Sequence, residues 1–225
     1  MLRCRAILFD LDGVLVDSTP AVERVWRKWA DDHDLDQEFV MQWCHGRRSI
    51  ETIRRVAPYM DAAEENVNVE RREIEDLEGV RAIDGAAELL ASLPPEHWTI
   101  VTSATRPLAS ARMGHVHLPL PDEAITAELV QLGKPHPEPY LKGAEVLGFR
   151  PEDCLVIEDT AAGIAAAKAA GMQAVAFTTT YPPHELKQAD VIVRSCRDLR
   201  VETREDPEGE LELNVHFEYS TADAR

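Results

Sequence analysis

Two aspartates directly follow a short apolar run near the start of the sequence. The stretch AILFDLDG places Asp10 and Asp12 one residue apart, after four residues typical of a buried strand. Neighbouring negative charges repel each other, and burying them is costly unless a positive group lies between them. A bound cation is the simplest such group, and Mg²⁺ prefers oxygen ligands of this kind. These residues therefore predict a metal site.

Three further stretches place polar residues after predicted strands or in a stiff loop. TIVTSAT supplies Ser103, LVIEDTAAG supplies Glu158 and Asp159, and GKPHP holds Lys134 between a glycine and two prolines. Ligands of open parallel sheets bind at the carboxyl ends of the strands, so we expect these loops to converge. Each residue alone has an ordinary explanation as a turn, a helix cap or a solvated lysine. All of them together, in this order, favour a functional site.

The elements that must position these residues follow from the apolar pattern. Short apolar runs separated by helical patterns predict an α/β fold, with a Rossmann-like parallel sheet covered on both faces. The predicted strands lie in CRAILF, HWTIVTS, DCLVIED, QAVAF and DVIV. Two of the helices are predicted to end at Gly148 and Gly171, which suit helix C-termini.

The segment after the first strand differs from the rest, because residues 19 to 82 contain helical patterns and no convincing strand. Its first helix is predicted to have Thr19 as N-cap. We therefore expect an inserted α-helical cap domain over residues 18–82, with a core formed by residues 1–17 and 83–225. Hinges are expected near residues 17–19 and 80–84. The C-terminal stretch LRVETREDPEGELELNVHFEYS is predicted to form a β-hairpin.

Composition restricts the partners. The chain of 225 residues has 24 basic and 41 acidic side chains and a net charge of −17, which argues against nucleic acid and anionic membranes. No apolar run approaches the roughly 20 residues of a membrane span, and the first strand leaves no room for a signal peptide. The four scattered cysteines suggest neither zinc nor disulfides. We expect a cytoplasmic protein that is monomeric or weakly dimeric, and the composition still allows a small anionic substrate.

Four stretches together resemble the motifs of the haloacid dehalogenase superfamily: DLDGVLVDS, VTSAT, GKPHPEPY and VIEDTAAGIAAAKAAG. The helical insertion resembles the first type of cap in that superfamily. Within it, the sequence is similar to phosphatases of glycerol 3-phosphate and 2-deoxyglucose 6-phosphate, and the β-phosphoglucomutases are close relatives with the same cap type. The resemblance implies a phosphoric monoester hydrolase that acts on a small phosphorylated metabolite, a sugar or polyol phosphate, through an aspartyl-phosphate.

The resemblance also implies roles for individual residues. Asp10 would be the nucleophile, and Asp12 would be the general acid for the leaving alcohol and then the base for water. The implied ligands of Mg²⁺ are Asp10, the main-chain carbonyl of Asp12, and Asp159, with Glu158 as a further candidate. The implied phosphoryl-binding groups are the Ser103 hydroxyl, the backbone N–H of Ala104, and Lys134. Covalent catalysis, metal and acid–base chemistry together suit a reaction that needs very large acceleration.

The cap loop WCHGRRSIET carries two arginines at the start of a helix, where the helix dipole disfavours cations. We expect Arg47, and secondarily Arg48, to face the core when the cap closes. There the arginine would contact the part of the substrate that does not react.

Two other functions remain open from the sequence. A phosphosugar mutase of the β-phosphoglucomutase kind would place a histidine shortly after the first motif, where this chain has Val22; His33 and His45 are interpreted as surface histidines. A non-catalytic sugar-phosphate sensor is disfavoured because every catalytic position carries the expected residue type. A pure protein that released no phosphate would revive the sensor hypothesis.

Overall fold

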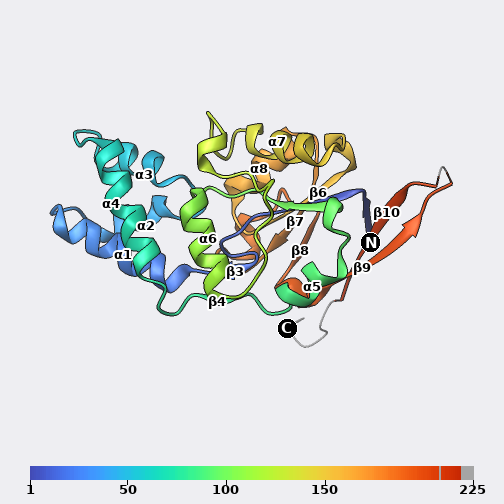
Figure 1. Cartoon of the computed structure of the whole chain (residues 1–225). Coiled ribbons are helices and arrows are strands. Elements are labelled where there is room, and N and C mark those ends of the chain that lie inside the picture. Colours follow the sequence, from blue (N-terminus) through green and yellow to red (C-terminus); the bar gives the residue numbers. More distant parts are fainter. Residues whose placement is uncertain (208, 219–225) are drawn as a thin grey trace.

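A sheet of five parallel strands lies at the centre of the larger part of the molecule (Figure 1). The computed structural model describes residues 1–207 and 209–218. In sheet order the strands are β5 (Trp98–Ile100), β2 (Ala6–Phe9), β6 (Cys154–Glu158), β7 (Gln173–Phe177) and β8 (Val191–Val193). Strands β2 and β6 are buried along their whole length, which explains their unbroken apolar sequences. The predicted α/β fold is confirmed.

Helices cover both faces of the sheet. Side chains alternate along each strand, so apolar side chains project from both faces and must be buried on each. They are α5 (Ala86–Ser92), α6 (Arg106–His115), α7 (Glu138–Leu147) and α8 (Ala161–Ala169). Ile7 and Phe9 of β2 belong to the apolar cluster that includes α5 and α6, and Leu8 belongs to the cluster with α7 and α8. Gly148 and Gly171 have positive φ at the ends of α7 and α8, as their positions predict.

Four more helices lie to one side of the sheet (Figure 1). They are α1 (Thr19–Asp32), α2 (Gln37–Cys44), α3 (Ser49–Val56) and α4 (Ala62–Glu75). Their inward side chains, including Trp26 and Trp29, form a separate apolar cluster. The expectation that Thr19 caps the first helix is wrong, because Ser18 occupies the N-cap position and Thr19 is already helical. None of the described helices has the length and apolar character needed to cross a membrane.

The chain enters and leaves this helical segment through a short antiparallel ribbon. Strand β3 (Val16–Asp17) pairs with β4 (Arg81–Ala82), so that Val16 faces Ala82 and Asp17 faces Arg81. The Arg81 guanidinium donates to the Asp17 carboxylate at 2.8 Å. The ribbon lies where the sequence predicts the two hinges.

A second, antiparallel sheet contains both ends of the described chain. Its order is β1 (Leu2–Cys4), β10 (Leu211–Phe217) and β9 (Leu199–Glu205), so the predicted C-terminal hairpin is confirmed. The turn between β9 and β10 includes residue 208, which lies outside the described residues. The N-terminal run expected as one strand is divided at Arg5 between the two sheets.

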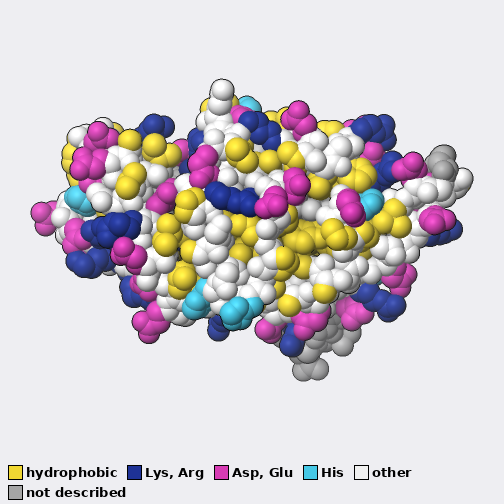
Figure 2. All heavy atoms as spheres, in the orientation of Figure 1, with side chains coloured by type: hydrophobic (Ala, Val, Ile, Leu, Met, Phe, Trp, Pro, Cys, Tyr) yellow, Lys and Arg dark blue, Asp and Glu magenta, His cyan; other side chains and the backbone are white. Residues whose placement is uncertain are grey.

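Charged side chains of both signs are interspersed on the face shown in Figure 2. Exposed ion pairs such as Arg24 with Asp76, at 2.6 Å, and Lys168 with Asp190, at 2.8 Å, mix the two signs locally. Such exposed pairs each contribute little to stability, so the energetics of the fold rest on the apolar clusters.

Candidate active site

A buried lysine joins two carboxylates at the carboxyl end of β2. Asp10 directly follows this strand, and its backbone N–H donates to the carbonyl of Ile157 at 2.9 Å. The Lys134 Nζ lies 2.6 Å from Asp10 Oδ1 and 2.7 Å from Glu158 Oε1. Burial alone would lower the pKa of Lys134, but the two carboxylates raise it above its usual value. Burial raises the pKa of Asp10 to about 7, although Lys134 opposes the shift.

The two oxygens of Glu158 already receive donors from the protein. Oε1 accepts hydrogen bonds from Lys134 and from the Tyr140 hydroxyl at 2.9 Å. Oε2 accepts from the backbone N–H groups of Asp159 and Thr160 and from the Thr160 hydroxyl, each at 2.9 Å. Burial works to raise the pKa of Glu158, but Lys134 and these hydrogen bonds bring it below its usual value. This carboxylate is therefore held as a fixed anion beside the lysine.

Asp159 has the opposite environment. Its Oδ1 is buried without a hydrogen-bond partner, and burial together with Glu158 and Asp10 raises its pKa well above the usual value. Ligand atoms of Asp10, Glu158 and Asp159 lie within 4.8 Å of one another. Gly13 keeps this place open, since a Cβ there would lie 1.9 Å from Asp159 Oδ2. An orphaned carboxylate oxygen beside a second acidic group fits a hard divalent cation.

Ser103 and Ala104 follow β5 and line the same cavity as Asp10. The Ser103 hydroxyl donates to the carbonyl of Gly46 at 3.2 Å, so it contacts the loop between α2 and α3. The Ala104 N–H donates to the Thr102 hydroxyl at 3.0 Å. The structure thus places both predicted phosphate-binding residues at the cavity, close to the helical segment.

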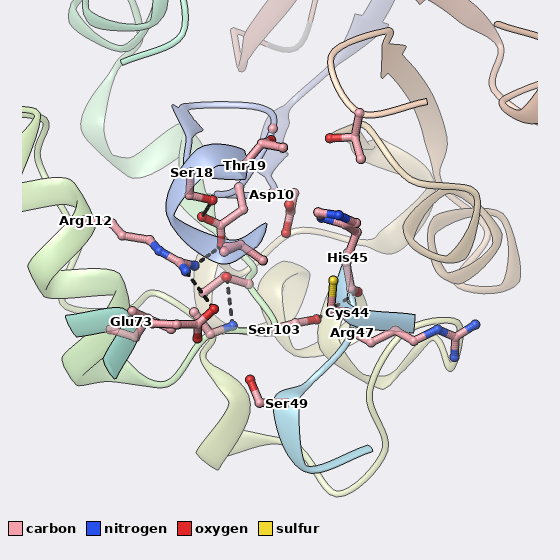
Figure 3. Close-up of a pocket in the computed structure, with 18 of the residues that line it drawn as sticks. Asp10, Ser18, Thr19, Cys44, His45, Arg47, Ser49, Glu73, Ser103 and Arg112 are labelled. Carbon is pink, nitrogen blue, oxygen red and sulfur yellow. Dashed lines mark hydrogen bonds and ion pairs between the residues drawn. The ribbon is translucent and has the colours of Figure 1, made fainter. Parts of the chain in front are cut away.

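Asp12 accepts hydrogen bonds from Ser18 and Arg112, two of the residues labelled in Figure 3. The Ser18 hydroxyl donates to its Oδ1 at 2.7 Å, which explains why Ser18, the N-cap residue of α1, makes no capping hydrogen bond with its side chain. Nη1 of Arg112, a residue of α6, donates to Oδ2 at 2.7 Å. Asp12 is thereby directed toward the cavity wall formed by α6, away from the lysine that holds Asp10.

A buried carboxylate of α4 completes this wall. Glu73 Oε1 lies 3.3 Å from Arg112 Nη2, and both side chains line the cavity. Burial raises the pKa of Glu73 to about 7, although Arg112 opposes the shift. The sequence analysis missed both residues. A signal existed: Glu73 lies one helical turn after Val69, and Arg112 one turn after Leu108, so each shares a face with a buried apolar residue.

The two cap-loop arginines have different surroundings. The Arg47 guanidinium lies over the Trp43 ring, 5.3 Å from its centroid, and points away from Asp10 in Figure 3. Arg47 nevertheless lines the cavity. Arg48 pairs with Glu51 and donates to the backbone carbonyls of Val130 at 3.2 Å and Gln131 at 3.0 Å. Arg48 therefore ties the helical segment to the loop that precedes Lys134.

His45 is not the surface histidine expected from the sequence. It lines the same cavity as Asp10, and burial lowers its pKa. The reason is the turn at Gly46, which has positive φ and packs so closely on Thr160 that a Cβ would lie 2.6 Å from a methyl carbon. Val22 also lines the cavity, whereas His33 contacts Trp29 and Glu65 within the helical segment.

Comparison with known proteins identifies the family. A family model described as haloacid dehalogenase-like hydrolase matches residues 4–171. Hexitol phosphatase A of Escherichia coli (strain K12) is 40% identical over 205 residues, which cover 89% of this chain and 95% of the relative. The chain belongs to the haloacid dehalogenase-like hydrolases.

Two further comparisons place this hydrolase within the family. Glycerol-1-phosphate phosphohydrolase 2 of Saccharomyces cerevisiae is 40% identical over 215 residues, which cover 89% of this chain and 86% of the relative. The crystal structure of β-phosphoglucomutase from Clostridium difficile matches with a TM-score of 0.70 and 26% identity, over 88% of this chain and 93% of that chain. The enzyme class expected from the sequence, a phosphoric monoester hydrolase, is confirmed by the named phosphatases among the relatives.

Proposed function

We propose that this hydrolase is a Mg²⁺-dependent phosphatase of small sugar or polyol phosphates that acts through an aspartyl-phosphate on Asp10. The observation that carries the proposal is the buried Asp10–Lys134–Glu158 arrangement next to the unpartnered Asp159 oxygen, in a cavity lined also by Asp12. The relatives named as hexitol phosphatase and glycerol-1-phosphate phosphohydrolase support the substrate class.

In the first half of the reaction, a carboxylate oxygen of Asp10 attacks the phosphorus atom. The bond between phosphorus and the ester oxygen breaks as the new bond forms, and Asp12 gives its proton to the departing oxygen. Lys134, the Ser103 hydroxyl and backbone N–H groups near Ala104 hold the phosphoryl oxygens. Phosphoryl transfer depends mainly on such positioning and neutralisation of charge.

In the second half, Asp12 removes a proton from a water molecule, and the water oxygen attacks the phosphorus of the aspartyl-phosphate. The bond to Asp10 breaks, which restores its carboxylate and releases inorganic phosphate. Asp12 is again protonated for the next turnover. The same side chain therefore serves as acid and then as base.

The residues that fit the cation are Asp10, Asp159 and the main-chain carbonyl of Asp12. When bound, the cation would neutralise the two carboxylates and the transferring phosphoryl group. Glu158 was predicted as a further candidate ligand, but its oxygens already accept five hydrogen bonds from the protein. We propose that Glu158 holds Lys134 and the Thr160 turn in place instead.

We propose that residues 18–82 act as a cap that closes over the site about the β3–β4 ribbon. Ser103 with Gly46, and Arg48 with the carbonyls of residues 130 and 131, are contacts between the two parts. Closure of this kind excludes water and completes a binding site. We also propose that the protein is a monomer or a weak dimer and that it is located in the cytoplasm.

A phosphate-release screen tests the function. The pure protein with Mg²⁺ should release inorganic phosphate from some members of a panel of sugar, polyol and glycolate phosphates. A mutase would instead convert an ester into an isomeric phosphate. Asp10→Asn should abolish release while its thermal unfolding stays cooperative, because an amide is a poor nucleophile. Substantial release by that variant would refute the role of Asp10, and no release by the wild type would favour the sensor hypothesis.

A further inference from the structure

A charged pair is buried in the cavity wall where α4 meets α6. Glu73 and Arg112 are 4% and 3% exposed, and they come from the two parts of the molecule that the β3–β4 ribbon joins. Figure 3 labels both members of the pair together with Ser18, and Arg112 also donates to Asp12. A buried ion pair is often no more stable than apolar residues of the same size. Stability alone therefore does not explain why charged residues stand here.

The pair also has unused hydrogen-bonding capacity. Nε and Nη2 of Arg112 are buried without a hydrogen-bond partner, although Nη2 lies near Glu73. Only Nη1 makes a short hydrogen bond, with Asp12. Buried donors without partners are rare in folded proteins and call for an explanation such as a ligand. Since Arg112 and Glu73 line the cavity that contains Asp10, a ligand in that cavity can reach them.

We propose that Glu73 and Arg112 together bind hydroxyl groups of the leaving alcohol and so select neutral polyol or sugar phosphates. This inference rests on the phosphatase function proposed above. A hydroxyl group can donate to the Glu73 carboxylate while a neighbouring hydroxyl accepts from Arg112. An alkyl group would leave Nε and Nη2 of Arg112 without an acceptor and would donate nothing to Glu73, which is costly in a buried site.

The local charge disfavours an anionic leaving group. The Glu73 carboxylate already neutralises the single guanidinium of Arg112. A substrate whose leaving group carries a carboxylate, such as phosphoglycolate, would therefore place a second negative charge next to Glu73, with no free cation among the described residues beside it to balance that charge. The pair therefore separates hydroxylated neutral leaving groups from both alkyl and acidic ones.

Glycerol 1-phosphate and propyl phosphate provide a matched test, because they have the same carbon chain and differ by two hydroxyl groups. The measurement is kcat/KM for each ester at pH 8 with Mg²⁺, expressed as their ratio. The wild type should prefer glycerol 1-phosphate. Glu73→Gln should lower the ratio by about 10- to 100-fold, the effect expected for loss of a hydrogen bond to a charged group.

Glu70→Gln is the matched control. Glu70 lies one helical turn before Glu73 on α4 and is half-buried next to Thr105 of the core, but it does not line the cavity. This variant should keep the wild-type ratio. Thermal unfolding shows whether each variant is folded, and Glu73→Asp, which shortens the side chain but keeps the charge, supplies a second test with the same expected direction.

The outcomes separate the inference from the proposed function. An active wild type whose ratio is unchanged in Glu73→Gln and Glu73→Asp would overturn the inference alone. An equal fall of the ratio in Glu70→Gln would also overturn it, because the effect would belong to α4 as a whole. Failure of the wild type to release phosphate from any ester would overturn the proposed function and this inference with it.

Discussion

At the scale of single residues, Asp12 is held by Ser18 and Arg112 on the side of the cavity where a leaving group would lie. Asp12→Asn removes the proton donor but keeps the shape. For alkyl and polyol phosphates we expect kcat/KM to fall by about 10²–10⁴-fold, as is typical for loss of general acid–base catalysis. The fall should be smaller for p-nitrophenyl phosphate, since p-nitrophenolate leaves without protonation. Equal losses on both types of ester would assign the proton transfer to another group.

We expect the buried Glu73 carboxylate to lower the stability of the protein while it contributes to substrate specificity. Its pKa rises from 4.5 to about 7 on folding, so the folded protein binds a proton more readily in this range. Stability should therefore fall as the pH rises from about 4.5 to 7, and the loss persists above that range. Glu73→Gln cannot titrate, so its stability should come closest to that of the wild type at or below about pH 4 and exceed it at pH 8. The expected gain is about 1–3 kcal/mol, or several degrees in Tm.

Thermal unfolding of the metal-free wild type and Glu73→Gln at a series of pH values checks this expectation. Arg112, Asp12 and Glu70 also face Glu73 and are common to both proteins, so the difference between them isolates Glu73. Identical pH profiles would show that the Glu73 carboxyl group is not perturbed by folding.

Most of the site residues that the sequence identified lie at the end of a strand, whereas Lys134 was identified from its loop with two prolines. Asp10 and Glu158–Asp159 lie where parallel strands end at one sheet edge, so their convergence follows from local pattern and sheet geometry. Arg112 and Glu73 could not be identified in the same way, because their contacts depend on how α4 packs against α6. His45 depends similarly on the docking of Gly46 against Thr160.

At the scale of elements, the loop between α2 and α3 carries two arginines with different contacts, Arg47 with Trp43 and Arg48 with the core. Arg47→Ala should lower kcat/KM for sugar or polyol phosphates by about 10- to 100-fold, and p-nitrophenyl phosphate much less, if Arg47 leaves Trp43 to contact the substrate. Steady-state kinetics on both esters decide this. Equal losses would place Arg47 in phosphate binding, and no loss on either would leave it as a partner of Trp43.

Arg48→Ala serves as a comparison, because Arg48 contacts carbonyls of the core rather than the cavity. We expect it to affect all esters alike, through weaker closure of the cap. A loss restricted to large substrates would contradict this assignment.

Element boundaries were predictable where one local signal dominates. The glycines after α7 and α8 have the expected positive φ, and the alternating C-terminal pattern forms its hairpin. The N-terminal run was not predictable as two strands, since the Arg5 N–H donates to Asp153 at 2.7 Å while Cys4 pairs with β10. Ser18, not Thr19, is the N-cap residue of α1. The hydrogen bond from the Ser18 hydroxyl to Asp12 was not predictable from the sequence alone.

At the scale of the whole molecule, a cation that binds only the folded state must raise its stability. Mg²⁺ should increase Tm because it relieves the repulsion between Asp10 and Asp159. When its concentration is 100 times the Kd, the free energy of unfolding should rise by about 2.7 kcal/mol. Differential scanning fluorimetry measures this shift without any substrate. Asp159→Asn should abolish the shift, and Ca²⁺ should support turnover poorly because its coordination is looser. Full activity after exhaustive chelation would refute metal dependence.

The β3–β4 ribbon has a consequence for how such a chain can be rebuilt. Asp17 and Arg81 are partners in an antiparallel pair, so the two points where the chain crosses between its parts lie side by side. The intervening segment can therefore be exchanged for another, or replaced by a tight turn, without changing the course of any strand in the parallel sheet. The five strands and the loop with Lys134 would then form a constant core. Residues 18–80 would form an exchangeable insertion whose two ends meet at the Asp17–Arg81 pair.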